Sequence, residues 1–268
     1  MAKRNAPVIG IVGGVGPYAG LDLNRKIFDN TLTDGNDQDH LEVLLYSTGG
    51  RVADRTGWLL QGEGEDPATG LLHALEALER AGATVAAIAC NTAHSEKIIT
   101  PVKQALAARG AGIELVDMIE ETGAYLRRLF AATGLSSVRV GLLATEGTIR
   151  TGVYDKLRRS EFGEIDLLLP QEKVTGLVHR AIYDRDWGIK ARSNPVTARA
   201  RTDCLAAVNS LAAGGAAAVI LGCTELPLAL PEPRIGEVLL INPAEVTARA
   251  LVARAAPDKL KPQPIQAG

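Results

Sequence analysis

Short apolar segments alternate with longer amphipathic ones along most of the chain. The apolar segments are continuous, as in strands of a sheet that helices cover on both faces. The amphipathic ones carry apolar residues at helical spacing, as Leu71, Leu75 and Leu78 do before Gly82. This alternation predicts an α/β fold with mostly parallel sheets. The expected strands are 8–12, 43–46, 85–89, 113–116, 138–143, 165–169, 217–221 and 238–241, and the expected helices are 70–81, 96–108, 119–131, 150–160 and 195–213.

A weak internal repeat predicts how these elements are organised. The segment around Gly10 resembles the one around Gly141, 131 residues later, and the apolar residues before Cys90 resemble those before Cys223, 133 residues later. Chance similarity between strands rich in Ala, Gly and Val is the alternative explanation. The nearly equal spacings favour two pseudo-symmetric three-layer α/β/α lobes.

The repeat assigns one cysteine to each lobe. We expect residues 1–115 plus 228–268 to form the N-terminal lobe with Cys90, and residues 116–227 to form the C-terminal lobe with Cys223. Ligands of open α/β sheets bind at the carboxyl ends of strands. Both cysteines are therefore expected to face one active-site cleft between the lobes.

Composition narrows the class of protein. Of the 268 residues, 46% are hydrophobic and 22% charged, which is enough for a full core. The net charge is −2, without a basic cluster, which argues against nucleic acid as the main partner. Three cysteines without a C-x-x-C pair predict no disulfide framework and no metal site. Without a signal-peptide pattern or an apolar run long enough to span a bilayer, a cytoplasmic protein with no membrane partner is expected.

Two of the cysteines stand where chemistry is expected. Cys90 and Cys223 each follow an expected strand and open a polar turn. If a helix begins at that turn, its N-terminus favours the thiolate. Inverting a stereocentre requires that one group remove a proton from one face while a second group delivers a proton to the other. Cys204, in an Ala- and Leu-rich helical segment, is expected to be a core residue.

Four motifs together resemble the aspartate/glutamate racemase superfamily, most closely its aspartate racemase branch. They are GGVGP at 13–17, DRT at 54–56, CNTAH at 90–94 and LGCTELPL at 221–228, and the resemblance runs from about 8 to 243. It implies two pseudo-symmetric lobes, a homodimer, and an isomerase that needs neither pyridoxal phosphate nor a metal. It also implies that Cys90 and Cys223 are the acid/base pair, with Cys223 deprotonating the L-enantiomer and Cys90 the D-enantiomer.

The resemblance also implies a set of substrate-binding residues. It assigns Asn91, Thr92 and Thr224 to the α-carboxylate and amino group, and Thr145 to a substrate-facing position. Arg55 and Lys190 match cations near the substrate, where they suit a side-chain carboxylate and the charge that develops at Cα.

Three further residues in these motifs have roles that the sequence leaves open. Gly16 belongs to a glycine-rich loop that lacks the spacing of a dinucleotide-binding turn, and we expect it to line the substrate site. Glu225 replaces a histidine usual in glutamate racemases, which favours the aspartate branch, although it is equally explained as a carboxylate at a helix N-terminus. His94 is expected to be structural rather than catalytic.

The predicted function is cofactor-independent racemisation of an acidic amino acid, aspartate first and glutamate second. Other enzymes of the superfamily are alternatives. Arylmalonate decarboxylases typically keep one of the two cysteines, and a neutral hydantoin ring has no use for paired cations. Maleate cis–trans isomerases use a cysteine nucleophile and share the lobes, but the DRT and CTE signatures favour the racemase. A non-catalytic amino-acid-binding module is the remaining alternative.

Overall fold

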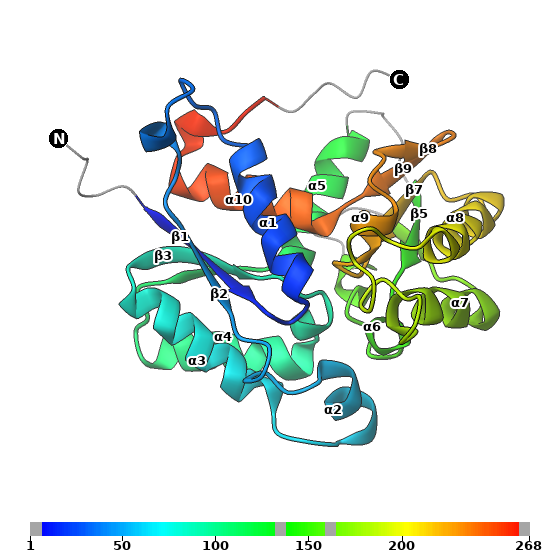
Figure 1. The fold of residues 1–268 in the computed structure, drawn as a ribbon, viewed down its shortest axis with the longest axis horizontal. Coiled ribbons are helices and arrows are strands. Elements are labelled where there is room, and N and C mark those ends of the chain that lie inside the picture. Colours follow the sequence, from blue (N-terminus) through cyan, green and yellow to red (C-terminus); the bar gives the residue numbers. More distant parts are fainter. Residues whose placement is uncertain (1–6, 132–137, 159–164, 263–268) are drawn as a thin grey trace.

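The computed structural model describes residues 7–131, 138–158 and 165–262. Its strands form two mostly parallel sheets, each with helices on both faces, and the two resulting lobes lie side by side (Figure 1). The α/β fold with two lobes that the pattern of apolar segments predicts is confirmed.

The first sheet has the strand order β2-β1-β3-β4. Successive side chains of β1 point to opposite faces, so Ile9 and Ile11 pack in one apolar cluster and Val12 in another. The strands are β1 (Val8–Gly13), β2 (Val43–Ser47), β3 (Ala83–Ile88) and β4 (Glu114–Val116), and the helices on this lobe include α1 (Pro17–Asp29), α2 (Arg55–Gln61), α3 (Pro67–Arg80) and α4 (Glu96–Ala108).

The second sheet has the order β6-β5-β7-β9-β8, in which only the short β8 is antiparallel. Its two faces are likewise covered by separate apolar clusters. The strands are β5 (Val138–Leu143), β6 (Ile165–Leu168), β7 (Ala218–Leu221), β8 (Arg234–Ile235) and β9 (Val238–Ile241), and the helices include α6 (Glu146–Arg150), α7 (Glu172–Tyr183), α8 (Ala198–Ala213) and α9 (Leu226–Ala229).

The internal repeat of the sequence is a repeat of topology. The order β2-β1-β3-β4 corresponds to β6-β5-β7-β9. The hydrogen bonds before the two cysteines also correspond. Ala89 N donates to Val12 O at 3.0 Å in the first lobe, and Gly222 N donates to Leu143 O at 2.6 Å in the second. The two cysteines that follow these residues therefore occupy equivalent places beyond the carboxyl ends of β3 and β7.

The helix after the fourth strand of each sheet crosses to the other lobe. Helix α5 (Met118–Ala131) follows β4 but packs with β5 and β7, and α10 (Pro243–Ala255) follows β9 but packs with β1 and β3. Figure 1 shows α10 beside α1 on the first lobe. The chain therefore crosses back between β9 and α10. Residues 228–241, expected in the N-terminal lobe, contribute β8 and β9 to the second sheet instead.

Two local expectations need correction. The helix expected over 150–160 is divided: α6 ends at Arg150, Gly152 takes a positive φ of 62°, and a 3-10 turn covers Asp155–Arg158. Residues 159 and 160 lie outside the described part of the chain. Helices α1, α2, α7 and α10 are not among the expected helices, although α1 and α10 both start with a proline in their first turn.

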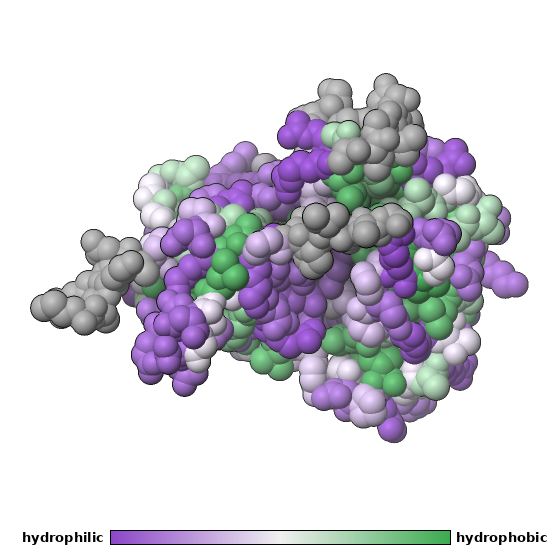
Figure 2. Space-filling view, turned by 90° about the horizontal axis from the view of Figure 1, so that it is seen from above, coloured by the Kyte–Doolittle hydropathy of each residue, from purple (hydrophilic) through white to green (hydrophobic). Residues whose placement is uncertain are grey.

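The surface of the described molecule is mixed in character. Figure 2, the view from above, shows hydrophilic residues over most of the visible face and apolar residues in small separate groups. In the part of the chain that the structure describes, no helix combines the length and apolar character that a membrane crossing needs.

Candidate active site

A small pocket lies between the two lobes at the carboxyl ends of β3 and β7. Its cavity volume is about 20 Å³. Both Cys90 and Cys223 line it, and each is almost fully buried. The complete lining is Val15, Arg55, Thr56, Cys90, Asn91, Thr92, Thr145, Tyr183, Lys190, Cys223, Thr224 and Glu225.

The turns after the two cysteines differ from a plain strand-to-helix turn. After Cys90 the chain forms a 3-10 turn, Thr92–His94, and α4 begins only at Glu96. After Cys223 the chain enters α9, which has only four residues. A helix dipole acts within its first turn and needs several aligned peptides. The expected stabilisation of thiolates by helix N-termini is therefore not supported.

Around Cys223 the dominant group is the Glu225 carboxylate. Cys223 Sγ donates to Glu225 Oε2 at 3.0 Å, and Thr224 Oγ1 donates to the same oxygen at 3.2 Å. Lys190 Nζ donates to the other oxygen, Oε1, at 2.6 Å. Burial raises the pKa of the Cys223 thiol well above its usual value, and the negative charge of Glu225 raises it further, while Lys190 opposes both.

The ion pair keeps Glu225 charged inside the pocket. Burial alone would raise the pKa of its carboxyl, but Lys190 and the hydrogen bonds from Cys223 and Thr224 together lower it below the ordinary value. Burial likewise opposes the charge of Lys190, whose pKa Glu225 nevertheless raises. The Lys190 side chain is 29% exposed, so water weakens its attraction to Glu225.

Around Cys90 the dominant group is the Arg55 guanidinium. Arg55 is the first residue of α2, whose N-cap Asp54 accepts hydrogen bonds from Thr56 N and Gly57 N. Its Nη1 and Nη2 donate to Ala53 O and Val15 O, each at 3.1 Å. Burial is the largest single effect and disfavours the charge of Arg55, but Cys90, Asp54 and Tyr183 together raise its pKa above the ordinary value. Among the described residues its buried Nε has no hydrogen-bond partner.

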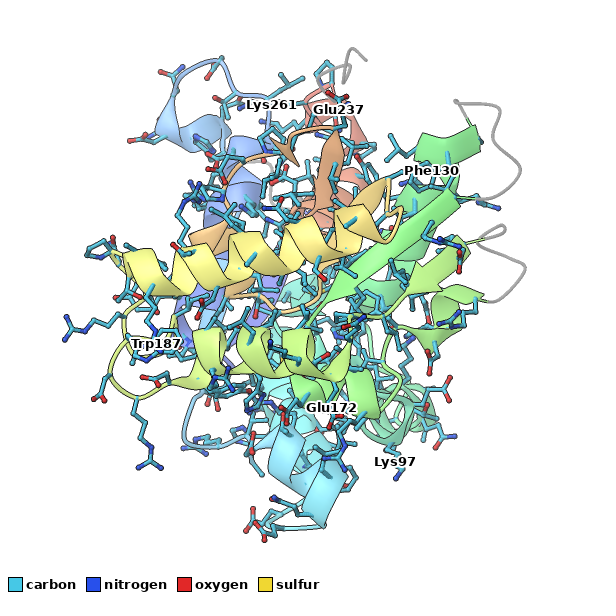
Figure 3. All side chains as sticks on the ribbon, turned by 90° about the vertical axis from the view of Figure 1, so that its right-hand side faces the viewer. Lys97, Phe130, Glu172, Trp187, Glu237 and Lys261 are labelled. Carbon is cyan, nitrogen blue, oxygen red and sulfur yellow. The ribbon has the colours of Figure 1, made fainter. Side chains whose placement is uncertain are left out.

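The segment between α7 and α8 places Lys190 in the pocket. Lys190 N donates to Ile182 O at 3.0 Å, and Thr197 Oγ1 donates to Trp187 O at 2.7 Å. The Arg199 guanidinium also lies over the Trp187 ring, 4.0 Å from its centroid. Figure 3 shows α7 and α8 side by side, with Trp187 in the segment that joins them. These contacts anchor the segment against both helices.

Threonine hydroxyls connect the two lobes beside the thiols. Thr92 Oγ1, of the first lobe, lies 2.9 Å from Thr148 Oγ1 of the second. Thr148 Oγ1 lies 3.1 Å from Thr145 Oγ1, which also accepts from Thr148 N and caps α6. The pocket residues of the two lobes are thus held in one hydrogen-bonded row.

Gly16 borders the pocket through its contact with Glu225. A Cβ at this position would lie 2.4 Å from Glu225 Oε1, and the φ of Gly16 is 140°. Only glycine combines this backbone conformation with room for the carboxylate. Gly16 is absent from the pocket lining itself but leaves room for the Glu225 carboxylate.

Two residues singled out in the sequence have structural surroundings. His94 Nδ1 is hydrogen-bonded to Cys90 O at 2.8 Å, and its Nε2 accepts from Met118 N at 3.3 Å. This arrangement requires a neutral ring with the proton on Nδ1, and burial lowers the His94 pKa accordingly. Cys204 is fully buried in the core of the second lobe, where burial raises its pKa to about 12.

Comparison with known proteins shows the family to which the chain belongs. A model of the family described as Asp/Glu/Hydantoin racemase matches residues 12–251, which is most of the chain. The chain belongs to the Asp/Glu/Hydantoin racemase family. Membership supports a racemase, that is, an isomerase that acts on a small-molecule amino acid.

Solved structures of this family share the two-lobe fold. An aspartate racemase from Picrophilus torridus is 24% identical with a TM-score of 0.75, over 95% of this chain and 96% of its own. An aspartate racemase homologue from Pyrococcus horikoshii is 25% identical with a TM-score of 0.66, over 92% and 98%. A glutamate racemase from Francisella tularensis, in complex with D-glutamate, is 17% identical with a TM-score of 0.60, over 97% and 85%.

Two tyrosines, one lining the pocket of this racemase-family chain and one bonded to a residue of its lining, were not expected from the sequence. Tyr183 lines the pocket from the end of α7, and Lys190 Nζ lies 5.5 Å from the centroid of its ring. Tyr154 Oη donates to Asn91 Oδ1 at 2.5 Å from behind the pocket. Neither tyrosine belongs to a motif, and no local pattern marks them. Across the described residues, no group of three His, Cys, Asp or Glu side chains is placed to hold a metal ion.

Proposed function

We propose that this protein racemises an acidic amino acid, aspartate first and glutamate second, without a cofactor. The observation that carries the proposal is that two thiols, Cys90 and Cys223, line one pocket together with Arg55, Lys190 and Glu225. The equivalent positions of the two cysteines in the two lobes support their assignment to opposite faces of the substrate.

The proposed chemistry is a proton transfer between Cα and two sulfur atoms. One thiolate takes the Cα proton from one face, and the other thiol gives its proton to the opposite face. The roles exchange when the reaction runs in reverse. Following the resemblance, Cys223 deprotonates the L-enantiomer and Cys90 the D-enantiomer.

The charges of the pocket favour an acidic amino acid over the alternatives. Arg55 and Lys190 supply two positive charges and Glu225 one negative charge. A zwitterionic acidic amino acid carries two carboxylates and one ammonium group, which is the complementary set. Maleate lacks the ammonium that would offset Glu225, and a hydantoin ring is neutral. The buried carboxylate therefore favours an amino-acid substrate.

Hydrogen-bond donors suit the charge that develops during the reaction. Removing the Cα proton transfers negative charge to the α-carboxylate, which donors held in place stabilise. Asn91 Nδ2 is buried and has no partner among the described residues, as is true of Arg55 Nε. We assign Asn91, Thr92 and Thr224 to the α-carboxylate and amino group, and Thr145 to the wall of the site.

The test is isotope exchange with loss of optical activity. The protein is incubated with L-aspartate or L-glutamate in D2O without added cofactor, while NMR follows the Cα proton and polarimetry follows the rotation. We expect both signals to decay together. Cys90→Ala and Cys223→Ala should each lower the racemisation rate by about 10²–10⁴-fold.

Cys204→Ala is the matched control, because Cys204 lies in the core away from the pocket. It should retain activity in the folded protein. Binding of aspartate without exchange would identify a binding module, and turnover of hydantoin or maleate instead would identify another enzyme of the superfamily. Full activity in either active-site cysteine variant would contradict the two-base assignment.

Two further expectations accompany this function. The resemblance implies a homodimer, and sedimentation of the purified protein measures its mass directly. A cytoplasmic location is consistent with reduced cysteines, since thiols that act as acid and base must stay unoxidised.

A further inference from the structure

The two thiols occupy equivalent places in the fold but face different charges. Two residues after Cys223 stands Glu225, and two residues after Cys90 stands Thr92. The carboxylate is thus present beside one thiol only. On the other side the first lobe places the positively charged Arg55 beside Cys90 in the same pocket.

We propose that Glu225 holds the proton on Cys223 in the substrate-free protein, so that Cys90 is the resting base. Glu225 acts on a reacting atom directly, because its Oε2 accepts the hydrogen bond of Cys223 Sγ at 3.0 Å. This inference rests on the proposed two-thiol racemisation and adds to it the starting position of the proton.

The contacts of Glu225 explain why the proton stays on Cys223. Thr224 Oγ1 shares Oε2 with the thiol, and Lys190 Nζ binds Oε1. The carboxylate is therefore fixed with one oxygen toward the sulfur, and it is 4% exposed. A thiolate formed at this distance would repel the carboxylate in a region from which most water is excluded.

The other charged or titratable groups that face Cys223 do not reverse this effect. Lys190 attracts a thiolate, but its charge is already paired with Glu225. Tyr183 and Tyr154 stay neutral, because burial raises the pKa of Tyr183 to about 12 and that of Tyr154 well above its usual value, and a thiolate at Cys223 would raise both further. Burial and Glu225 together thus raise the pKa of Cys223.

The proton balance of one turnover follows from this starting state. The Cα–H bond breaks and an S–H bond forms on Cys90, while the S–H bond of Cys223 breaks and a new C–H bond forms on the opposite face of Cα. The protein is left with a Cys90 thiol and a Cys223 thiolate beside Glu225. Repulsion from Glu225 then favours return of a proton from water to Cys223 and loss of one from Cys90.

The experiment measures which cysteine is the thiolate. The substrate-free protein is treated briefly with iodoacetamide at neutral pH, and mass spectrometry of its peptides gives the alkylation rate of each cysteine. Cys90 and Cys223 are 6% and 8% exposed, so access is closely matched and the rates compare thiolate fractions. We expect Cys90 to react about tenfold faster or more.

Glu225→Gln removes the charge but keeps the shape of the side chain. We expect it to speed alkylation of Cys223 by roughly tenfold and to leave Cys90 nearly unchanged. Glu232→Gln is the control, because Glu232 pairs with Arg201 away from the two thiols. If Glu225→Gln does not fold, the alkylation rates of the unmodified protein are measured as a function of pH. The inference then requires that the rate for Cys223 rise at a higher pH than the rate for Cys90.

Equal rates, faster reaction of Cys223, or an unchanged ratio in Glu225→Gln would overturn the inference. Failure of the racemisation assay is a separate result, because alkylation is measured without substrate. A comparison of kcat/KM for the two enantiomers cannot replace the alkylation test. The equilibrium constant of a racemisation is unity, so kcat/KM is equal in the two directions whichever thiol starts as the base.

Discussion

Asn91 has one end of its amide engaged and the other end available to a ligand. Its Oδ1 accepts a hydrogen bond from Tyr154 Oη, which must be the donor because burial keeps the phenol neutral. Its Nδ2 is then the end without a partner in the described part of the chain. Tyr154 thus sets the orientation of a residue that we assign to the substrate carboxylate.

At the residue scale we predict that Tyr154→Phe weakens substrate binding. Without the phenol, the Asn91 amide loses its orientation and a buried oxygen loses its donor, which costs about 1–3 kcal/mol of stability. We expect KM to rise by roughly tenfold with a smaller change in kcat, measured by polarimetry. Tyr46→Phe, on β2 outside the pocket, is the control and should change neither. An unchanged KM in folded Tyr154→Phe would refute the orienting role.

The start of α5 depends on one buried carboxylate. Asp117 Oδ1 accepts from Ile119 N at 2.9 Å and from Glu120 N at 3.2 Å, at the point where the chain crosses between lobes. Lys156 of the second lobe and Lys103 of the first both form ion pairs with it. Burial alone would raise the Asp117 pKa, but the charges of Lys156 and Lys103 lower it well below its ordinary value.

At the element scale we predict that Asp117→Asn destabilises the fold by about 3–5 kcal/mol, because the Lys156 side chain, 6% exposed, loses its buried counterion. Urea unfolding measures the change. The control is Glu120→Gln, whose side chain is 49% exposed and which should cost under about 1 kcal/mol.

The same carboxylate predicts an acid-dependent stability. Since its pKa is lowered in the folded state, its contribution is complete above the unfolded pKa of about 3.9 and declines as the pH falls below that value. The unmodified protein should therefore lose more stability between pH 6 and pH 3 than Asp117→Asn does. Thermal melts at pH 6 and pH 3 measure the loss in each protein. The same loss in the unmodified protein and in Asp117→Asn would contradict this assignment.

The lobes meet tightly next to the pocket. Gly147, at the start of α6, faces Thr56 of α2, and a Cβ on Gly147 would lie 2.6 Å from Thr56 Oγ1. Arg55 is the neighbour of Thr56, so the position of the guanidinium depends on this contact between lobes. No side chain fits between the two helices without moving one of them.

At the scale of the whole molecule we predict that Gly147→Ala separates the lobes at the pocket. It should lower kcat/KM by about tenfold or more, because a small displacement of Arg55 disturbs the catalytic geometry. Gly176→Ala is the matched control on α7, where the nearest atom to a new Cβ lies 3.9 Å away. Wild-type kinetics in Gly147→Ala would show that the lobes tolerate the added methyl group.

The local sequence determined the strands, the repeat and the two catalytic candidates. Buried parallel strands have continuous apolar stretches, and the cysteines of the two repeats directly follow such stretches, so short segments contain this information. Contiguous motifs also identified Arg55, Asn91, Thr92, Thr224 and Glu225, all of which border the pocket.

Only the tertiary structure decided how the lobes share their parts. The apolar face of α5 or α10 shows that each helix packs on something, but it does not say on which sheet, since both sheets offer similar surfaces. The same holds for the pairing of Lys190 with Glu225 and of Tyr154 with Asn91. A residue's own sequence neighbourhood records whether it is buried, whereas its partner across the molecule depends on how distant elements pack.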